Sequence, residues 1–298
     1  MCIRDRGNIL SRTQFPTWKG NSKDAFFNNL FSSIQQLFAE HPNLHLIGIG
    51  IDAPSCVPEE GIIKAASNLP LKGEVPIVDI FTIKYKKPVF LCNDANAAAL
   101  GEGKFGNAKH LKNYIVVTLG TGLGAGIVVN GQLLVGQSGL ASELGHIVVQ
   151  KDGRQCGCGK KGCLETYTAA SGIKRNFLAD LVQNNNVSSL EKLPIQEITT
   201  KIIGKAAKSG DITAINAFKK AGTVLGESLA NIVHLFEPEA IILAGGVAEV
   251  GEILFTPTIN ALFENLLPNY IDSVNILPSA LAENEAALLG ARCLVFSD

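Results

Sequence analysis

Hydrophobic residues in the first third of the chain recur with two spacings, one typical of helices and one of strands. Residues 24–40 carry large apolar side chains every three or four positions, which predicts an amphipathic helix. Residues 44–51 and 88–92 are short, nearly continuous apolar runs, typical of strands buried on both faces. An alanine-rich stretch at residues 95–102 predicts that a helix begins directly after the second strand.

The rest of the chain mixes the same elements with an antiparallel hairpin. Strands are predicted at residues 114–119, 125–129 and 132–135, and Asn130-Gly131 favours a tight turn between the last two. Further along, the pattern predicts helices at 171–184, 212–236, 252–267 and 283–296, and strands at 240–244 and 274–277. Strands that alternate with helices, together with a hairpin, predict an α/β fold with mixed sheets.

Composition and charge exclude several classes of protein. The chain has 298 residues, 46% of them hydrophobic, so it can bury a large core without disulfides. Its 26 basic and 27 acidic side chains are interspersed, and a net charge of −1 leaves no basic surface for a nucleic acid. No apolar run approaches the ~20 residues that span a membrane, and residues 1–6 do not resemble a signal peptide. We therefore expect a soluble, cytoplasmic protein that binds neither nucleic acid nor membrane.

Glycine occupies four alternate positions, of which Gly120, Gly122 and Gly124 lie between two predicted strands and Gly126 lies at the start of the second. The segment is not a P-loop, because no Gly-Lys-Ser/Thr follows, and not a dinucleotide-binding turn, because no helix follows. Such a turn brings backbone N–H groups and the Thr121 hydroxyl close enough to hold a phosphate. The alternative is a hairpin whose glycines serve packing only.

Asn93-Asp94 and Gly245-Gly246 each follow a predicted buried strand, where open α/β sheets bind their ligands. The Asp94 carboxylate can accept the proton of a sugar hydroxyl while that oxygen attacks a phosphoryl group. Asp94 can also cap the following helix, and the two roles are compatible. The glycine pair lets the backbone approach a planar ligand, although glycine is common at such turns.

Cys156, Cys158 and Cys163 are separated mainly by glycines, and His146 precedes them. Three thiolates and one imidazole form a tetrahedral set that zinc takes in closed, structural sites. The alternatives are free thiols or a disulfide, and neither explains the glycines.

Glu143 and Glu165 flank these candidate ligands. A histidine that binds a metal through one ring nitrogen can offer the other to a neighbour. The loop is therefore a candidate sugar clamp, in which carboxylates accept hydrogen bonds from hydroxyl groups. The alternative for Glu143 is a solvated surface charge.

Together these motifs resemble the ROK family of sugar kinases, repressors and related open reading frames, over nearly the whole chain from Gly7 onward. Residues 93–98 resemble the family's catalytic segment, and residues 118–126 resemble its second phosphate motif. Glu143-x-Gly-His146, with the three cysteines, is similar to its sugar and zinc signature. Residues 65–69 resemble the segment that places an asparagine on the sugar, and the likeness is greatest to bacterial glucokinases of the family.

The resemblance implies a two-lobed, actin-like and hexokinase-like (ribonuclease H-like) ATPase fold. The small lobe would span residues 1–108, completed by the helix at 283–298, and the large lobe, with the zinc loop, would span residues 109–282. The implied reaction is ATP-dependent phosphorylation of a hexose, glucose above all, with Mg²⁺, structural Zn²⁺ and a homodimer. The alternatives are a non-catalytic sugar-binding or transcriptional regulatory protein, or a kinase for N-acetylmannosamine, mannose or fructose.

The resemblance also implies a role for each candidate residue. Asp94 would be the general base. The sugar would contact Asn68, Asn93, Glu143, His146 and Glu165. Phosphate would bind at Gly120, Thr121, Gly122 and Gly124, adenosine at Gly245 and Gly246, and zinc at His146, Cys156, Cys158 and Cys163.

One departure from the family pattern concerns the start of the chain. The family opens with a strand and an Asp-x-Gly-Gly-Thr hairpin that holds ATP phosphates, and no such segment occurs in this sequence. Residues 7–17 resemble the family's segment immediately after that hairpin, whereas residues 1–6 do not resemble the hairpin itself. We therefore expect a kinase by descent that lacks its first strand and folds poorly or turns over weakly. We also expect no room before Gly7 for the helix-turn-helix that the family's repressors carry.

Overall fold

The computed structural model describes residues 2–3, 7–16, 22–64, 71–183, 188–270, 272–282 and 285–296. The chain forms two compact units. The first contains Met1–Gly106, Val135–Ala141 and Asn284–Asp298, and the second contains Asn107–Leu134 and Ser142–Glu283. Among the described residues, no helix is both long and apolar enough to cross a membrane.

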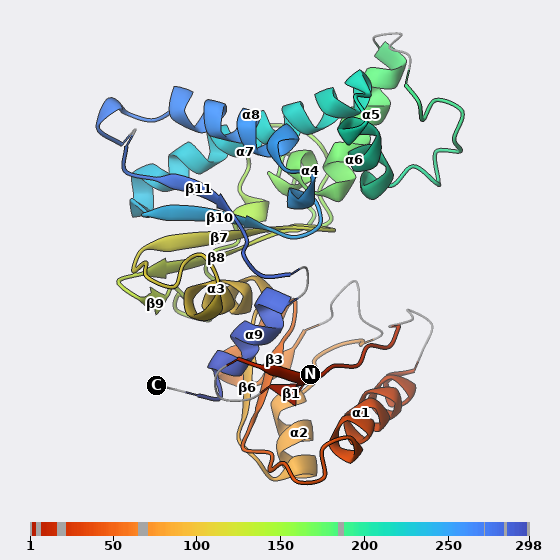
Figure 1. The fold of residues 1–298 in the computed structure, drawn as a ribbon, viewed down its shortest axis with the longest axis vertical. Helices are drawn as coiled ribbons and strands as arrows, with labels where there is room; N and C mark the ends of the chain where they lie inside the picture. Colours follow the sequence, from red (N-terminus) through yellow and green to blue (C-terminus); the bar gives the residue numbers. More distant parts are fainter. Residues whose placement is uncertain are drawn as a thin grey trace. The chain divides into compact units, whose positions relative to one another are not determined.

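A pair of parallel strands lies at the centre of the first unit (Figure 1). β3 (Ile49–Asp52) runs parallel to β6 (Val89–Cys92), and Asp52 lies opposite Cys92. α3 (Asp94–Phe105) follows β6, and α9 (Glu285–Cys293) packs against α3, β3 and β6. The other elements are α1 (Lys23–Ala39), α2 (Ile77–Tyr85), η1 (Pro58–Glu60), and the antiparallel pairs β1 (Cys2–Ile3) with β2 (Ile9–Ser11) and β4 (Cys56–Val57) with β5 (Ile62–Ile63).

Glycine allows α3 and α9 to touch along their backbones. A Cβ atom on Gly290 of α9 would overlap the Ala97 carbonyl oxygen of α3, and one on Gly101 of α3 would overlap the Ala286 carbonyl oxygen of α9. No side chain fits at either position, so the crossing point of the helices is fixed. Because Asp94 is the first residue of α3, this contact also fixes where its carboxylate stands in the unit.

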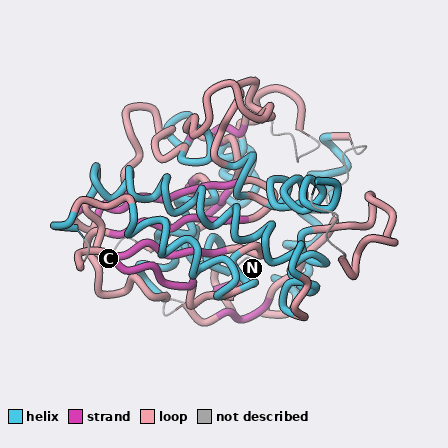
Figure 2. Tube along the Cα trace, turned by 90° about the horizontal axis from the view of Figure 1, so that it is seen from above, coloured by secondary structure: helices cyan, strands magenta, loops and turns pink. Residues whose placement is uncertain are grey.

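The second unit is built on a five-stranded mixed sheet. The strand order is β11 (Asn275–Pro278), β10 (Ala240–Ala244), β7 (Tyr114–Leu119), β8 (Leu123–Val129) and β9 (Gln132–Leu133). β10 is parallel to both of its neighbours, β11 and β7. β8 is antiparallel to both of its neighbours, β7 and β9. α7 (Ile212–Phe236) and α8 (Glu252–Glu264) pack their apolar sides on this sheet (Figure 1, Figure 2). The unit also contains α4 (Glu165–Thr168), α5 (Ala170–Gln183), α6 (Thr200–Lys208), η2 (Leu144–His146), η3 (Ala248–Val250) and η4 (Pro268–Tyr270).

The structure follows the sequence pattern most closely where the periodicity is long and unambiguous. The helix at 212–236 and the strand at 240–244 have the predicted bounds. The strand predicted at 44–51 begins only at Ile49, because Leu44 and Ile47 are exposed and lie outside the ladder. The pattern misses α2, whose β-branched and aromatic residues are also typical of strands. It also misses β1, which lies before Gly7.

Asp52 ends β3 beside a group of other ionisable side chains. Burial, with a contribution from the charge of Asp94, raises the pKa of Asp52 from 3.8 to about 6. Burial also raises the pKa of the Cys56 and Cys92 thiols to about 12. The folded chain therefore holds the Asp52 proton more tightly than the unfolded chain, and folding loses stability wherever that proton is released.

Replacing Asp52 with Asn should stabilise the protein at neutral pH and have little effect in acid. Well below pH 3.8 the carboxyl is protonated in both states, so nothing is gained; above about pH 6 the folded chain carries the full cost of the ionised group. The substitution should then raise the free energy of unfolding by about 1–3 kcal/mol. Urea unfolding at pH 3 and pH 8 measures this, with the exposed Glu74→Gln as control. An equal change at both pH values would contradict the expectation.

Candidate functional site

Two glycine-containing turns lie side by side at one edge of the five-stranded sheet. β7 and β10 are parallel, with Thr118 opposite Ala244, so the turns that follow them leave the same edge. The Val247 N–H donates a hydrogen bond to the Leu119 carbonyl oxygen at 3.1 Å. Gly245 has a φ of +89°, and a Cβ atom there would collide with the Leu119 backbone. Glycine is therefore required where the two turns meet.

The turn between β7 and β8, here called the glycine turn, consists of Gly120, Thr121 and Gly122. The Gly120 N–H donates to the Gly122 carbonyl oxygen at 3.0 Å, and Thr121 is exposed at the tip. A Cβ atom on Gly120 would meet nothing within 4 Å, so packing does not require glycine there and a ligand can approach the backbone. Gly124 instead lies within β8, which begins two residues earlier than the sequence predicts.

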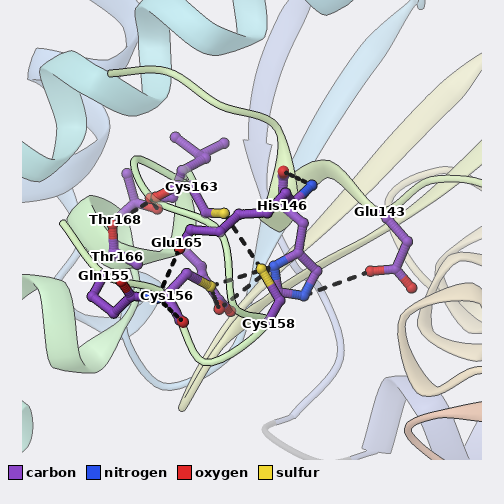
Figure 3. Close-up of polar contacts among 11 residues, drawn as sticks. Glu143, His146, Gln155, Cys156, Cys158, Cys163, Glu165, Thr166 and Thr168 are labelled. Atoms are coloured by element: carbon purple, nitrogen blue, oxygen red, sulfur yellow. Dashed lines mark hydrogen bonds and ion pairs between the residues drawn. The ribbon is translucent and has the colours of Figure 1, made fainter. Parts of the chain in front are cut away.

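Four candidate metal ligands converge in the loop that follows (Figure 3). One ligand atom from each of His146, Cys156, Cys158 and Cys163 lies within 4.8 Å of the others. The Cys158 and Cys163 sulfurs are 3.6 Å apart, and Cys156 Sγ lies 3.7 Å from His146 Nδ1. With Zn–S bonds of about 2.3 Å, tetrahedral zinc would hold its sulfur ligands about 3.8 Å apart. The set therefore fits zinc, and Cys156, Cys158 and Cys163 are all free of disulfides.

The two ring nitrogens of His146 face different neighbours (Figure 3). Nδ1 faces Cys156 and lies 3.7 Å from Oε1 of Glu165, whereas Nε2 lies 4.0 Å from Oε2 of Glu143. Nδ1 is thus the nitrogen suited to a metal, and Nε2 is left for another polar group. Cys156 donates a hydrogen bond to Glu165 Oε1 at 3.0 Å, and burial raises the pKa of Cys156 to about 12. A metal must displace this proton to bind.

The metal-ligand loop, residues 143–165, is held against the glycine turn. Its first part, η2, packs on β8, and a Cβ atom on Gly145 would overlap the Leu123 carbonyl oxygen. A Cβ atom on Gly122 would lie 2.9 Å from Oε2 of Glu165, so that carboxylate borders the turn. The glycine turn and the candidate metal ligands therefore belong to one site on the second unit.

Asn93 and Asp94 have different roles at the start of α3, in the first unit. The Asn93 side-chain oxygen accepts hydrogen bonds from the N–H groups of Ala95, at 2.9 Å, and Asn96, at 3.3 Å, so Asn93 is the helix cap. Asp94 is exposed, and its Oδ1 accepts from the Ala95 N–H at 2.9 Å. Its Oδ2 has no partner among the described residues, which leaves that oxygen available to a ligand.

One predicted residue, Asn68, lies outside the described residues. The sequence pattern also does not single out Arg154, which supports the metal-ligand loop. Its guanidinium donates to the Thr166 carbonyl oxygen at 2.8 Å and to Asn176 Oδ1 at 2.7 Å, and it stacks on the Tyr167 ring, 4.5 Å from the centroid. The available signal was an arginine in a glycine-rich loop, two positions before the first clustered cysteine.

Comparisons with known proteins give consistent matches over almost the whole chain. The chain matches the ROK family over residues 1–297. It is 33% identical to a glucokinase of Thermotoga maritima, over 98% of this chain and 92% of that protein. It is 30% identical to the xylose repressor of Bacillus subtilis, over 96% of this chain and 71% of the repressor.

A solved structure supports the same relationship. The crystal structure of a ROK family glucokinase from Streptomyces griseus, in complex with glucose and AMPPNP, is similar with a TM-score of 0.84 and 30% identity. The match covers 98% of this chain and 93% of that one. The chain therefore has the two-lobed, actin-like and hexokinase-like fold that its motifs imply, with a mixed sheet.

The purified protein should contain about one zinc ion per chain, because four ligand atoms already converge. Cys158→Ser should lose most of this zinc, since a serine hydroxyl is a poor replacement for a thiolate. Cys293→Ser, in α9, is the matched control and should keep it. Metal analysis by mass spectrometry measures the content after dialysis. Equal zinc in the two variants would show that Cys158 is not a ligand, and no zinc in the parent protein would show that the cluster is a group of free thiols.

Proposed function

Because the chain belongs to the ROK family, we propose that it is a hexose kinase, which transfers the γ-phosphoryl group of ATP to the 6-hydroxyl of glucose. The observation that carries the proposal is the exposed Asp94 carboxylate, at the end of β6, on a helix that Asn93 already caps. The names of the Thermotoga maritima and Streptomyces griseus relatives support a sugar kinase and favour glucose.

In the proposed reaction, Asp94 acts as the general base. Its carboxylate accepts the proton of the sugar 6-hydroxyl as that oxygen forms a bond to the γ-phosphorus, and the bond to the β–γ bridging oxygen breaks to release ADP. Because phosphoryl transfer depends mainly on positioning and charge stabilisation, the residues that hold the two substrates share the catalytic task. Magnesium, bound with the nucleotide, would offset the triphosphate charge.

The remaining proposed roles follow the placement of the side chains. Glu143, His146 and Glu165 would bind sugar hydroxyls, with Nε2 of His146 as the polar group left beside the metal site. Asn93 and Asn68 would add contacts to the sugar. Gly120, Thr121 and Gly122 would hold phosphate, because the glycine turn is open to a ligand at Gly120, and Gly124 of β8 would complete this phosphate set. Gly245 and Gly246 would lie against adenosine. Zinc would hold the loop through His146, Cys156, Cys158 and Cys163.

The second candidate function is sugar-responsive regulation without catalysis. The similarity to the Bacillus subtilis xylose repressor favours it. Both functions require a sugar site. They differ in whether the bound sugar is phosphorylated, which requires a general base and a bound nucleotide.

Asp94→Asn should lower kcat by about 10²–10⁴-fold and leave the KM for glucose near its original value, because the amide cannot take the proton. Coupled measurement of ADP release determines both constants. Asp79→Asn, an exposed acid in the first turn of α2, is the matched control and should keep full activity. A change confined to KM would assign Asp94 to binding and contradict its role as the base.

A panel of hexoses should separate a glucose kinase from the alternatives. We expect glucose to give a higher kcat/KM than mannose, fructose or N-acetylmannosamine, and calorimetry to show glucose binding to Asp94→Asn without turnover. If glucose binds to the parent protein but Mg-ATP yields no ADP, the regulatory function is favoured. Faster turnover of another hexose would support a hexose kinase but contradict glucose as its substrate.

A further inference from the structure

A cavity of about 500 Å³ lies in the second unit, between the metal-ligand loop and three helices. Its lining comes from Arg154 of the loop, Tyr167 of α4, Asn176 of α5 and one face of α7. The volume falls within the range of about 300–1,000 Å³ that is typical of sites for small molecules. None of the residues with a proposed role in the kinase reaction lines it.

The α7 face that lines this cavity is a polar stripe. Asn216, Lys219, Lys220 and Thr223 recur at the i, i+3, i+4 and i+7 positions, so they lie on one side of the helix. The Thr223 hydroxyl donates to the Lys219 carbonyl oxygen at 3.0 Å and can still accept a hydrogen bond. Within the part of the chain that the structure describes, neither the Lys219 ammonium nor the Asn216 amide has a partner.

Arg154 brings a second uncompensated charge to the cavity. Its hydrogen-bond acceptors are all neutral: the carbonyl oxygens of Thr166 and Gly172 and the side-chain oxygen of Asn176. Burial lowers the pKa of Arg154, and the nearby Arg175 lowers it further, but a guanidinium remains charged at any physiological pH. No carboxylate of the described residues forms an ion pair with it. A half-buried cation of this kind favours an anion in the adjoining space.

The balance of charge around the cavity is positive. Arg154, Lys219 and Lys220 line it, and the buried Asp180 forms an ion pair with Lys220. Arg154 and Lys219 are thus two cations that face a space large enough for a small molecule.

We propose that this cavity binds the phosphate group of a small phosphorylated metabolite of about the size of a sugar phosphate. Arg154 and Lys219 would hold the phosphate oxygens, since charge-assisted hydrogen bonds to phosphate are the strongest that these side chains form. The Asn216 amide and the Thr223 hydroxyl would meet hydroxyl groups on the remainder of the ligand.

Calorimetric titration with glucose 6-phosphate tests the proposal. Saturating glucose is kept in the cell, so that a hexose site elsewhere on the protein is already filled. Glucose 6-phosphate should bind to the parent protein at least about 10-fold more tightly than inorganic phosphate, because the sugar fills the cavity. Lys219→Gln should weaken this binding by about 10- to 100-fold. Lys201→Gln, an exposed lysine of α6, is the matched control and should leave it unchanged.

Three results would overturn the proposal. These are the absence of glucose 6-phosphate binding, equal binding by the two lysine variants, and equal affinity for inorganic phosphate. Loss of a dimer in Lys219→Gln on sedimentation, without ligand binding to the parent protein, would instead make the cavity an interface between copies. The proposal does not depend on the reaction proposed above. If glucose is not a substrate, the titration still measures binding of glucose 6-phosphate to the cavity. If the cavity binds no phosphorylated ligand, the measured phosphorylation of glucose is unaffected.

Discussion

The glycine turn is held at both of its ends by close backbone contacts that only glycine permits. The turn is bounded by Leu119, which ends β7, and by Leu123, which begins β8. Gly245 lies against the Leu119 backbone, and Gly145 lies against the Leu123 carbonyl oxygen. A side chain at either glycine would push its segment away from the strand end. The two contacts therefore bring the turn after β10 and the metal-ligand loop to the same three residues.

Around residues 157–160, the metal-ligand loop has little hydrophobic packing to hold its shape. Gly157, Cys158, Gly159 and Lys160 are exposed, so burial of apolar surface stabilises this part weakly. Hydrogen bonds donated by Arg154 and the convergence of four ligand atoms stabilise the loop instead. A metal that binds there contributes its binding free energy to the loop conformation. The conformation of this exposed part thus depends on the metal set more than on a hydrophobic core.

The sequence allowed the fold class, the longest elements and the clustering of the metal ligands to be predicted. These features rest on local signals: a 25-residue amphipathic period for α7, a short apolar run for β10, and four ligand residues close together in the chain. The contacts of Gly290 with α3 could not be predicted, because a glycine pattern does not say which distant backbone it will meet. The sequence also did not show that the polar stripe on α7 lines a cavity, because polar residues on a helix are usually solvated. Arg154 was missed because its partners lie 12 to 22 residues further along the chain.

Net charge describes the protein as a whole and says little about individual sites. A value of −1 with interspersed signs gives no long-range field. Yet Asp52 stands close enough to Asp94 for like charges to disfavour ionisation, whereas Arg154 and Lys219 face one cavity without a carboxylate between them. The charge of Asp94 disfavours ionisation of Asp52, and opposite charges elsewhere in the chain offset these local groups in the total. Charged groups without an opposite charge nearby are often found at ligand-binding and catalytic sites. The charge around each site is therefore more informative about function here than the net charge of the chain.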